Sequence, residues 1–302
     1  MTAKHTQAVP RVAGGLGWTA QLADYYDLTK PTIVWLIVMS TAVGCFLAAD
    51  GSLAAVETAQ ALLATALLAA GTGALNQWSE RREDSLMRRT RLRPIPAGRI
   101  SAKAAFGYSA VLVSAGLVYL LLAVNALCFW VGVVTVVSYN FVYTPLKTRT
   151  WWSTALGAVP GAMPALMGWA AMQGSLGPRA WVLFSILFLW QFPHFYAIAW
   201  MYREDYARAG IRMLPVIEPS GKSTHRQILA TQLLLLPASM APAWTGLAAG
   251  WYAPLAVLLS GGYLAAGVRL ARSGSAPHAK DLLKASVFYL PLLYALLVIA
   301  RP

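Results

Sequence analysis

Long apolar runs separated by short polar segments make up most of this chain of 302 residues. Several runs approach or exceed about 18 residues, the length at which an α-helix can cross the apolar core of a membrane. Because lipid offers the backbone no hydrogen-bond partners, we expect each run to span the membrane as a helix. The pattern predicts nine such helices, at about residues 31–49, 54–75, 104–124, 126–143, 154–173, 180–201, 227–248, 251–268 and 283–300.

Residues 1–30 differ from the rest of the chain because they are polar and irregular in pattern. We therefore expect a polar N-terminal segment, 1–30, followed by a single transmembrane domain, 31–302. The start of the chain lacks the apolar core of a secretory signal peptide, so no such signal is predicted. The predicted fold class is an all-α polytopic membrane protein.

Composition supports this class. Hydrophobic residues make up 58% of the chain and charged residues 12%, with a mean hydropathy of +0.56, which excludes disorder and argues against a soluble domain. The net charge is +13, but the basic residues lie in loops between apolar runs, so we expect no nucleic-acid partner. Cys45 and Cys128 form no C-x-x-C pattern, so disulfide scaffolds, zinc fingers and covalently attached haem have no support.

The basic residues also predict an orientation. If the N-terminus is cytoplasmic, all but Arg179 and Arg301 of the 24 lysines and arginines lie on the cytoplasmic side. This asymmetry follows the positive-inside rule. We therefore expect an integral protein of the bacterial inner membrane, with its N-terminus and polar loops in the cytoplasm and its C-terminus outside.

A stripe of oxygen-bearing side chains follows the second apolar run. Asn76, Glu80 and Asp84 occur at intervals of four residues, and each step of four advances about 40° around a helix, so the three share one face. Carboxylate and amide oxygens suit a hard divalent cation. The next loop supplies guanidiniums, which suit phosphate oxygens, at Arg88, Arg89, Arg91, Arg93 and Arg99. An alternative is that the acids only pair with these arginines.

Two further groups fall on the same side of the membrane. In the segment 190–210, His194 and Asp205 share a helix face if the helix continues past Pro193. Ionisable groups at the end of a membrane helix are candidates for function, although His194 could be a packing residue and Asp205 could pair with an arginine. Lys147, four residues after Tyr143, could neutralise phosphate oxygens or anchor a helix end.

Together, these groups predict magnesium–diphosphate chemistry at one membrane face. The cation would bridge carboxylates to a diphosphate, basic groups would neutralise the leaving group, and the apolar bundle would hold an isoprenoid tail away from water. A membrane transporter is an alternative from another class. Its charged groups should gather near the bilayer midplane, whereas those of this chain gather at one face.

Several motifs carry a resemblance to a known family. They are LTKP at 28–31, N-x-x-x-E-x-x-x-D at 76–84, RTRLRPIPAGRI at 89–100, YTPLKTRT at 143–150, GAVPGAMPALMGW at 157–169 and the segment 190–215. In these motifs the chain resembles the UbiA-type intramembrane prenyltransferases. The His194–Phe195 pair and the DYARAG segment make it similar to the branch that farnesylates haem, rather than to the quinone branch.

The resemblance implies a UbiA-type bundle with active-site loops on the cytoplasmic side, and a reaction. A farnesyl group would pass from farnesyl diphosphate to a vinyl group of haem b, and addition of water would give haem O for terminal oxidases. Mg²⁺ would be the cofactor, and the reaction would take place in the lipid bilayer. A haem A synthase or an oxidase assembly factor would be a protein partner. The alternative within the family is prenylation of an aromatic acid in quinone biosynthesis.

The resemblance also implies roles for individual residues. The metal ligands would be Asn76, Glu80, Asp84 and Asp205, which with Lys147 form the catalytic set. His194 would ligate the haem iron or position the porphyrin. The remaining contacts would come from Lys30, Arg88, Arg89, Arg93 and Lys147 to the diphosphate, and from Tyr143, His194 and Tyr206 to the substrate.

Two features depart from the family pattern. Glu80 stands where the superfamily usually has aspartate. The second acidic motif lacks the D-x-x-x-D spacing of the quinone enzymes, because position 201 is Met and position 209 is Ala. The resemblance therefore leaves open how a second magnesium ion would be held.

Overall fold

The computed structural model describes residues 17–49 and 55–302. Every regular element in these ranges is helical. The long elements are α2 (Pro31–Ala48), α3 (Ala55–Ser79), α5 (Ala102–Tyr119), α6 (Ala126–Val136), α8 (Ser153–Gln173), α9 (Pro178–Met201), α12 (Lys222–Trp244), α13 (Tyr252–Ser273) and α14 (Ala276–Ile299). The shorter ones are α1 (Trp18–Leu28), α4 (Arg81–Leu86), η1 (Leu120–Val124), η2 (Val137–Tyr143), α7 (Thr144–Leu146), α10 (Arg203–Arg208) and α11 (Leu214–Ile217).

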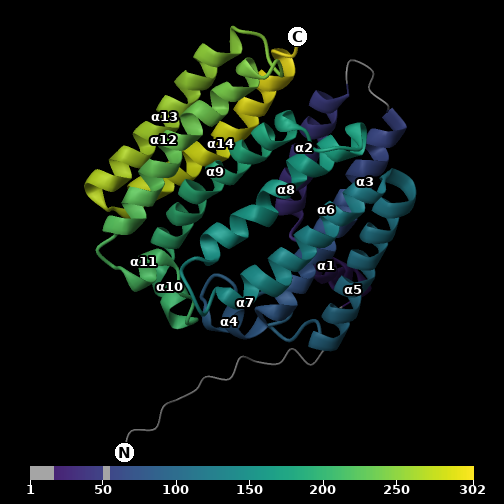
Figure 1. Ribbon diagram of the computed structural model, residues 1–302. Helices are drawn as coiled ribbons and strands as arrows, with labels where there is room; N and C mark the ends of the chain where they lie inside the picture. The colour runs from purple at the N-terminus through teal and green to yellow at the C-terminus, as the bar shows by residue number, and fades with distance from the viewer. Residues whose placement is uncertain (1–16, 50–54) are drawn as a thin grey trace, which may run out of the picture.

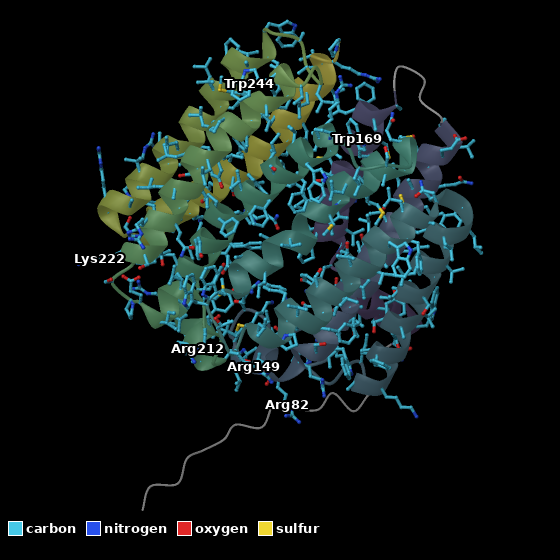
Figure 2. All side chains as sticks on the ribbon, viewed as in Figure 1. Arg82, Arg149, Trp169, Arg212, Lys222 and Trp244 are labelled. Atoms are coloured by element: carbon cyan, nitrogen blue, oxygen red, sulfur yellow. The ribbon has the colours of Figure 1, made fainter. Side chains whose placement is uncertain are left out.

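The predicted count of about nine spans is confirmed. Within residues 17–49 and 55–302, eight helical segments are long and apolar enough to cross a membrane. Helix α12 is not among them; its first turns carry Lys222, His225 and Arg226, and the rest of it contains two glutamines and two prolines. It nevertheless packs along α9 and α13 and runs from Lys222 at one end of the molecule to Trp244 at the other (Figure 2).

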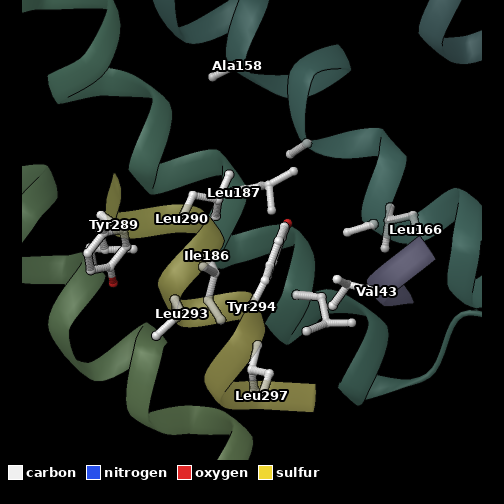
Figure 3. Packing of buried hydrophobic residues seen from close by; sticks show 14 of the residues in the cluster. Val43, Ala158, Leu166, Ile186, Leu187, Tyr289, Leu290, Leu293, Tyr294 and Leu297 are labelled. Carbon is white, nitrogen blue, oxygen red and sulfur yellow. The ribbon is translucent and has the colours of Figure 1, made fainter. Parts of the chain in front are cut away.

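The long helices form two groups that meet along α8 and α9 (Figure 1). One group contains α2, α3, α5, α6 and α8, and the other contains α9, α12, α13 and α14. Lipid tails are as apolar as leucine, so close packing rather than the hydrophobic effect holds such helices together. Figure 3 shows this packing where Leu290 and Leu293 of α14 lie beside Ile186 of α9.

Glycines bring α2 and α8 into direct backbone contact. A Cβ atom added to Gly168 of α8 would lie 2.0 Å from the carbonyl oxygen of Thr41 in α2, and one added to Gly44 of α2 would lie 2.6 Å from that of Ala165. Small residues allow this approach, which replaces side-chain contacts with backbone contacts between helices. The crossing fixes the wall of the cavity described below.

Two sequence-based expectations differ from the structure. Residues 18–28, expected to be irregular, form α1. This helix is short and exposed on much of its surface, so its sequence contains no apolar run that would have predicted it. Helix α9 does continue through Pro193, but it ends at Met201 and α10 starts at Arg203, so His194 and Asp205 do not share one helix. Residues 1–16 of the polar segment lie outside the described ranges, and the division at residue 30 stays a prediction.

The short helices α4, α7, α10 and α11 gather at one end of the bundle (Figure 1). Arg82, Arg149 and Arg212 project from this end, whereas Trp169 and Trp244 lie toward the opposite end (Figure 2). We call the end with the short helices and the three arginines the basic end. The predicted site residues of the polar loops lie here.

Candidate active site

Lys30 occupies an unusual position between α1 and α2. Its φ of 54° and ψ of 61° are left-handed, and Pro31 starts α2 directly after it. Gln77 of α3 holds the preceding turn, because its Nε2 donates to the carbonyl oxygens of Asp27 and Leu28. The Lys30 ammonium donates to Asn76 Oδ1 at 2.5 Å. The backbone geometry therefore directs the lysine onto the first residue of the predicted stripe.

The predicted stripe is present even though the helix is broken. Glu80 separates α3 from α4 with φ −87° and ψ 9°. The four-residue ladder still continues, since Glu80 N donates to Asn76 O at 2.9 Å and Asp84 N donates to Glu80 O at 2.8 Å. Asn76 and Asp84 are each only 1% exposed. Buried polar groups need partners, and these come from other elements.

Each of the three side chains has a partner at this end of the bundle. Lys147 Nζ lies 2.5 Å from Glu80 Oε1, and Arg93 Nη1 donates to both Asp84 oxygens at 2.8 and 2.9 Å. Asn76 Nδ2 donates to Thr144 Oγ1 at 3.0 Å. We call Lys30, Asn76, Glu80, Asp84, Arg93 and Lys147 the first cluster. The alternative interpretation expected the acids of the stripe to pair with arginines of the following loop. Of Glu80 and Asp84, only Asp84 does so.

The first cluster carries an excess of positive charge. Burial, together with the charges of Arg93 and Lys147, lowers the pKa of Lys30 to about 7. Burial acts to raise the pKa of Glu80, but Lys147 and Lys30 outweigh it and hold that pKa below its ordinary value. Burial likewise acts to lower the pKa of Lys147, but Glu80 outweighs it and raises the pKa. Three basic groups thus face two carboxylates, and an added anion would relieve their repulsion.

Tyr143 borders the first cluster. Lys147 Nζ lies 4.4 Å from the centroid of its ring, a cation–π contact. The π-helical segment η2 sets the ring beside that of Tyr139, with centroids 5.3 Å apart. The same ring lies against Gly157 of α8, where an added Cβ atom would be 2.6 Å from Tyr143 Cε2. Short π-helical segments often occur at functional sites.

A cavity of about 440 Å³ connects the first cluster with the interior of the bundle. Lys30 and Tyr143 line it, and His194 lines it as well. Its walls are otherwise mostly aliphatic and aromatic, including Ile33, Leu68, Met163, Pro164, Trp190 and Phe195. The cavity can therefore take a long apolar group whose anionic end lies against the first cluster.

His194 lies in an aromatic setting on α9. Its ring stacks on Trp190, with centroids 4.9 Å apart and planes at 25°. Its Nδ1 is 2.8 Å from the hydroxyl oxygen of Ser286 in α14. Both helices thus hold the ring at the cavity wall.

A second group at the basic end consists of Glu204, Asp205 and Arg208. We call it the Asp205 patch. An ion pair joins Asp205 to Arg208, and the backbone N–H of Arg89 donates to Asp205 Oδ2 at 3.3 Å. Arg88 and Arg89 line a separate cavity of about 600 Å³ together with Glu204 and Asp205. Two arginines predicted to bind diphosphate therefore lie beside Asp205.

Tyr206, predicted to contact substrate, has a different environment. It packs against a small apolar group of Met87, Ala199, Ala209, Ile211 and Met213. This group attaches α10 to the loop after α4. Its contact with substrate stays a prediction.

The predicted metal ligands fit magnesium by chemistry. Asn76, Glu80, Asp84 and Asp205 offer carboxylate and amide oxygens, the donors that hard cations prefer. In residues 17–49 and 55–302, no three His, Cys, Asp or Glu side chains form a ready metal site. The carboxylates are instead paired with basic groups, which an incoming diphosphate could take over. Assignment of these ligands stays a prediction.

Several contributing residues escaped the sequence analysis. Thr144 bonds Asn76, Arg208 holds Asp205, and the Asp24 carboxylate binds Arg99 Nε at 2.9 and 3.0 Å, which fixes α1 to the basic end. Ser286 holds His194 from 92 residues away. A lone serine or threonine in an apolar run gives no signal of such a role. The proximity of Tyr143, Thr144 and Lys147 in sequence is the one clue that could have indicated Thr144.

Comparison with known proteins agrees with this geometry. Residues 37–292 match the UbiA prenyltransferase family. The chain belongs to the UbiA prenyltransferase family. A relative in Solibacter usitatus, named protoheme IX farnesyltransferase, is 48% identical over 290 residues, covering 93% of this chain and 99% of the relative. A relative of the same name in Koribacter versatilis is 42% identical, covering 97% of each chain.

Solved structures share the fold. A digeranylgeranylglyceryl phosphate synthase structure has a TM-score of 0.78 at 16% identity, covering 93% of this chain and 99% of that one. A UbiA homolog from Archaeoglobus fulgidus bound to GPP and Mg²⁺ has a TM-score of 0.65 at 18% identity, covering 91% and 99%. At such identities, the likeness establishes the shared UbiA architecture.

Proposed function

We propose that this chain transfers the farnesyl group of farnesyl diphosphate to a vinyl group of haem b, with addition of water, and so produces haem O. Relatives 42–48% identical over nearly the whole chain bear the name protoheme IX farnesyltransferase. The observation that carries the proposal is the cavity of about 440 Å³, which joins a cationic cluster to a histidine in an apolar wall. These two ends match a diphosphate donor and a porphyrin acceptor.

The first cluster would bind the diphosphate. Lys30 lines the cavity, and the charges of Arg93 and Lys147 lie close to it in the first cluster, so their repulsion falls when phosphate oxygens lie between them. Arg88 and Arg89 would assist from the side of Asp205. As the bond between the allylic carbon and oxygen breaks, both electrons leave with the diphosphate, and these cations stabilise the developing charge.

Asn76, Glu80, Asp84 and Asp205 would hold Mg²⁺. When bound, the cation would neutralise diphosphate oxygens and thereby improve the leaving group. The A. fulgidus homolog, described as bound to GPP and Mg²⁺, makes the same cofactor reasonable for this chain. Lys147 and Arg93, now bonded to Glu80 and Asp84, would then turn to the phosphate oxygens.

The apolar walls of the cavity would hold the farnesyl chain and keep water from its reacting carbon. The vinyl π electrons of haem b form the new carbon–carbon bond, and water adds to the adjacent carbon and loses a proton. Tyr143, on the cavity wall beside Lys147, can stabilise positive charge through its ring face. His194 would bind the haem iron or position the macrocycle.

The other functions considered fit less well. A quinone-pathway enzyme would give no clear role to a histidine at the wall of the apolar cavity. A transporter would place charged groups at mid-membrane, whereas the first cluster and the Asp205 patch both lie at the basic end. The names of the relatives favour the haem reaction over both.

We also propose the surroundings of the reaction. The basic end would face the cytoplasm of a bacterial inner membrane, with the C-terminus on the outer side. A haem A synthase or an oxidase assembly factor would receive the product. Cysteines placed at Arg82 and Trp244 should react with a membrane-impermeant reagent from the cytoplasmic and outer sides, respectively.

One experiment tests the function directly. Membranes containing the protein are incubated with haem b, farnesyl diphosphate and Mg²⁺, and extracted haems are analysed by mass spectrometry. We expect a haem that has gained one farnesyl group and one hydroxyl group, with formation stopped by a chelator and restored by Mg²⁺. Prenylation of 4-hydroxybenzoate in place of haem would overturn the proposal.

A further inference from the structure

Ser286 of α14 makes two contacts that together hold the aromatic pair on α9. Its carbonyl oxygen accepts a hydrogen bond from Trp190 Nε1 at 2.8 Å, and its hydroxyl oxygen lies 2.8 Å from His194 Nδ1. The two rings stack on each other. Ser286 is fully buried, so no solvent competes for these bonds. One residue thus fixes the orientation of both side chains.

The Ser286 hydroxyl has one proton, and its position can be assigned. The hydroxyl oxygen also lies 2.6 Å from the carbonyl oxygen of Leu283. Two oxygens at that distance need a proton between them, and a carbonyl oxygen only accepts. The hydroxyl must therefore donate to Leu283. It follows that toward His194 the hydroxyl oxygen accepts, so Nδ1 of the imidazole carries the proton.

The second ring nitrogen is then determined as well. The surroundings of His194 are Trp190, Phe195 and other apolar groups that line the cavity, which disfavours a charged imidazolium. In the neutral ring, a proton on Nδ1 leaves a lone pair on Nε2. No hydrogen bond to Nε2 is present among the described residues. The lone pair is directed away from Ser286, on a side chain that borders the cavity.

We propose that Ser286 is a positioning residue that selects the Nδ1–H tautomer of His194 and so presents Nε2 as a ligand for the iron of a porphyrin substrate. This inference rests on the proposed function for the identity of that substrate. A neutral imidazole binds iron through an unprotonated nitrogen, and the bond made by the other nitrogen fixes which one is free. Ser286 acts through His194 and does not itself contact the substrate.

The first test needs neither haem nor prenyl donor. The full-length protein, labelled with ¹⁵N-histidine, is studied by NMR in lipid nanodiscs, and the His194 signals are identified by their loss in His194→Gln. We expect a protonated Nδ1 and an unprotonated Nε2. Ser286→Ala should convert His194 to a mixture of tautomers, whereas Ser286→Thr, which keeps a hydroxyl, should retain the parent pattern. A protonated Nε2 in the parent protein overturns the inference.

Ser239→Ala provides a matched control. Ser239 is also a buried serine, on α12, but its hydroxyl contacts Tyr289 at 2.6 Å and not His194. Its removal should leave the His194 signals unchanged. If Ser286→Ala fails to fold, the parent spectrum and that of Ser286→Thr still decide the tautomer. A folded Ser286→Ala with an unchanged His194 spectrum also overturns the inference.

The second test follows haem b itself. Loss of a residue that orients a metal ligand typically weakens metal binding about tenfold to a hundredfold, so Ser286→Ala should weaken haem affinity by about tenfold or more and shift the Soret band. Ser286→Thr and Ser239→Ala should resemble the parent, and the KM for farnesyl diphosphate should not change. Parent-like haem affinity and spectrum in Ser286→Ala would overturn the assignment of Nε2 to iron.

The two tests separate this inference from the proposed function. If the NMR result holds but the parent protein neither binds nor farnesylates haem b, the proposed function fails and the tautomer assignment stands. If Ser286→Ala farnesylates haem b as the parent does, with the parent spectrum, the function stands and the inference fails.

Discussion

The first cluster and the Asp205 patch both pair acids with bases at the basic end, but they are assembled differently. The first cluster depends on contacts between distant parts of the chain, such as Lys30 with Asn76, 46 residues apart, and Asn76 with Thr144, 68 residues apart. In the Asp205 patch, Asp205 pairs with Arg208, three residues away on the same short helix. The geometry of the first therefore depends on contacts across the bundle, whereas the ion pair of the second forms within one helical turn and only the contact from Arg89 N–H comes from a distant part of the chain.

The cavities beside the two groups differ as well. The first cluster borders a largely apolar cavity that continues to His194. The Asp205 patch borders a cavity lined by arginines and by residues at the α13–α14 turn, such as Gly274. From this contrast we expect the first cluster to bind the reacting end of the prenyl donor and the Asp205 patch to assist from the side. The predictions below test that order.

The largest effect should come from Asp84→Asn. The neutral amide cannot balance Arg93 and is a poorer metal ligand, so we expect kcat to fall by about a thousandfold, in line with the removal of a central electrostatic group. Activity is measured by formation of farnesylated haem, with folding checked by size-exclusion chromatography. Asp281→Asn, which changes an exposed carboxylate on α14, is the control. Near-parent activity of Asp84→Asn would remove it from the site.

Asp205→Asn should have a smaller effect, about a hundredfold in kcat, with a higher requirement for Mg²⁺. The loss should shrink as Mg²⁺ is raised, because the first cluster still supplies ligands. Asp281→Asn, the exposed carboxylate on α14 that lies outside both groups, again serves as the control and should remain close to the parent. Equal losses in Asp205→Asn and Asp84→Asn, at every Mg²⁺ concentration, would abolish the distinction between the two groups.

Lys147→Met should act mainly on the donor. The substitution removes the hydrogen bond between the Lys147 ammonium and a phosphate oxygen of the donor. A hydrogen bond to a charged group contributes about 1.5–3 kcal/mol, so the KM for farnesyl diphosphate should rise about tenfold or more. Haem affinity should stay unchanged. Arg149→Met, an exposed basic residue two positions later, serves as the control. A change in haem affinity with a parent-like KM for the donor would contradict the proposed role of Lys147.

The smallest effect should come from Gly157→Ala. Its methyl group would meet the Tyr143 ring at 2.6 Å, so the ring must move away from its place beside Lys147. We expect a severalfold loss of kcat/KM, equivalent to about 1 kcal/mol. Gly107→Ala on α5, where no atom lies within 4 Å of the added carbon, should leave activity unchanged.

The sequence predicted the membrane helices closely because length and apolarity alone determine them. The run predicted at 180–201 became α9 (Pro178–Met201), and Pro160 and Pro164 did not interrupt α8. In lipid, a backbone that left the helix would lose its hydrogen bonds, so the helix persists through proline. The spacing of Asn76, Glu80 and Asp84 likewise survived the break at Glu80.

What the sequence did not predict depends on contacts between elements. Helix α1 is short, and its docking relies on Asp24 meeting Arg99. The end of α9 at Met201 separates His194 from Asp205, although periodicity alone placed them on one face. The partners of Asn76 and His194 lie on other helices, and no local pattern marks Thr144 or Ser286. Such pairs become visible only when the bundle is assembled.

The backbone at Lys30 has a consequence for the interpretation of sequence variants. A left-handed residue other than glycine costs about 1 kcal/mol, and burial of the Lys30 cation adds to that cost. Glycine would relieve both, although it removes the hydrogen bond to Asn76 Oδ1, worth about 0.5–1.5 kcal/mol, and gives the unfolded chain more freedom, worth about 0.4–1 kcal/mol. Lys30→Gly should therefore melt within a few degrees of the parent while its use of farnesyl diphosphate falls sharply. A survey that ranks variants by stability or by cellular abundance would score this substitution as harmless, although it would inactivate the enzyme.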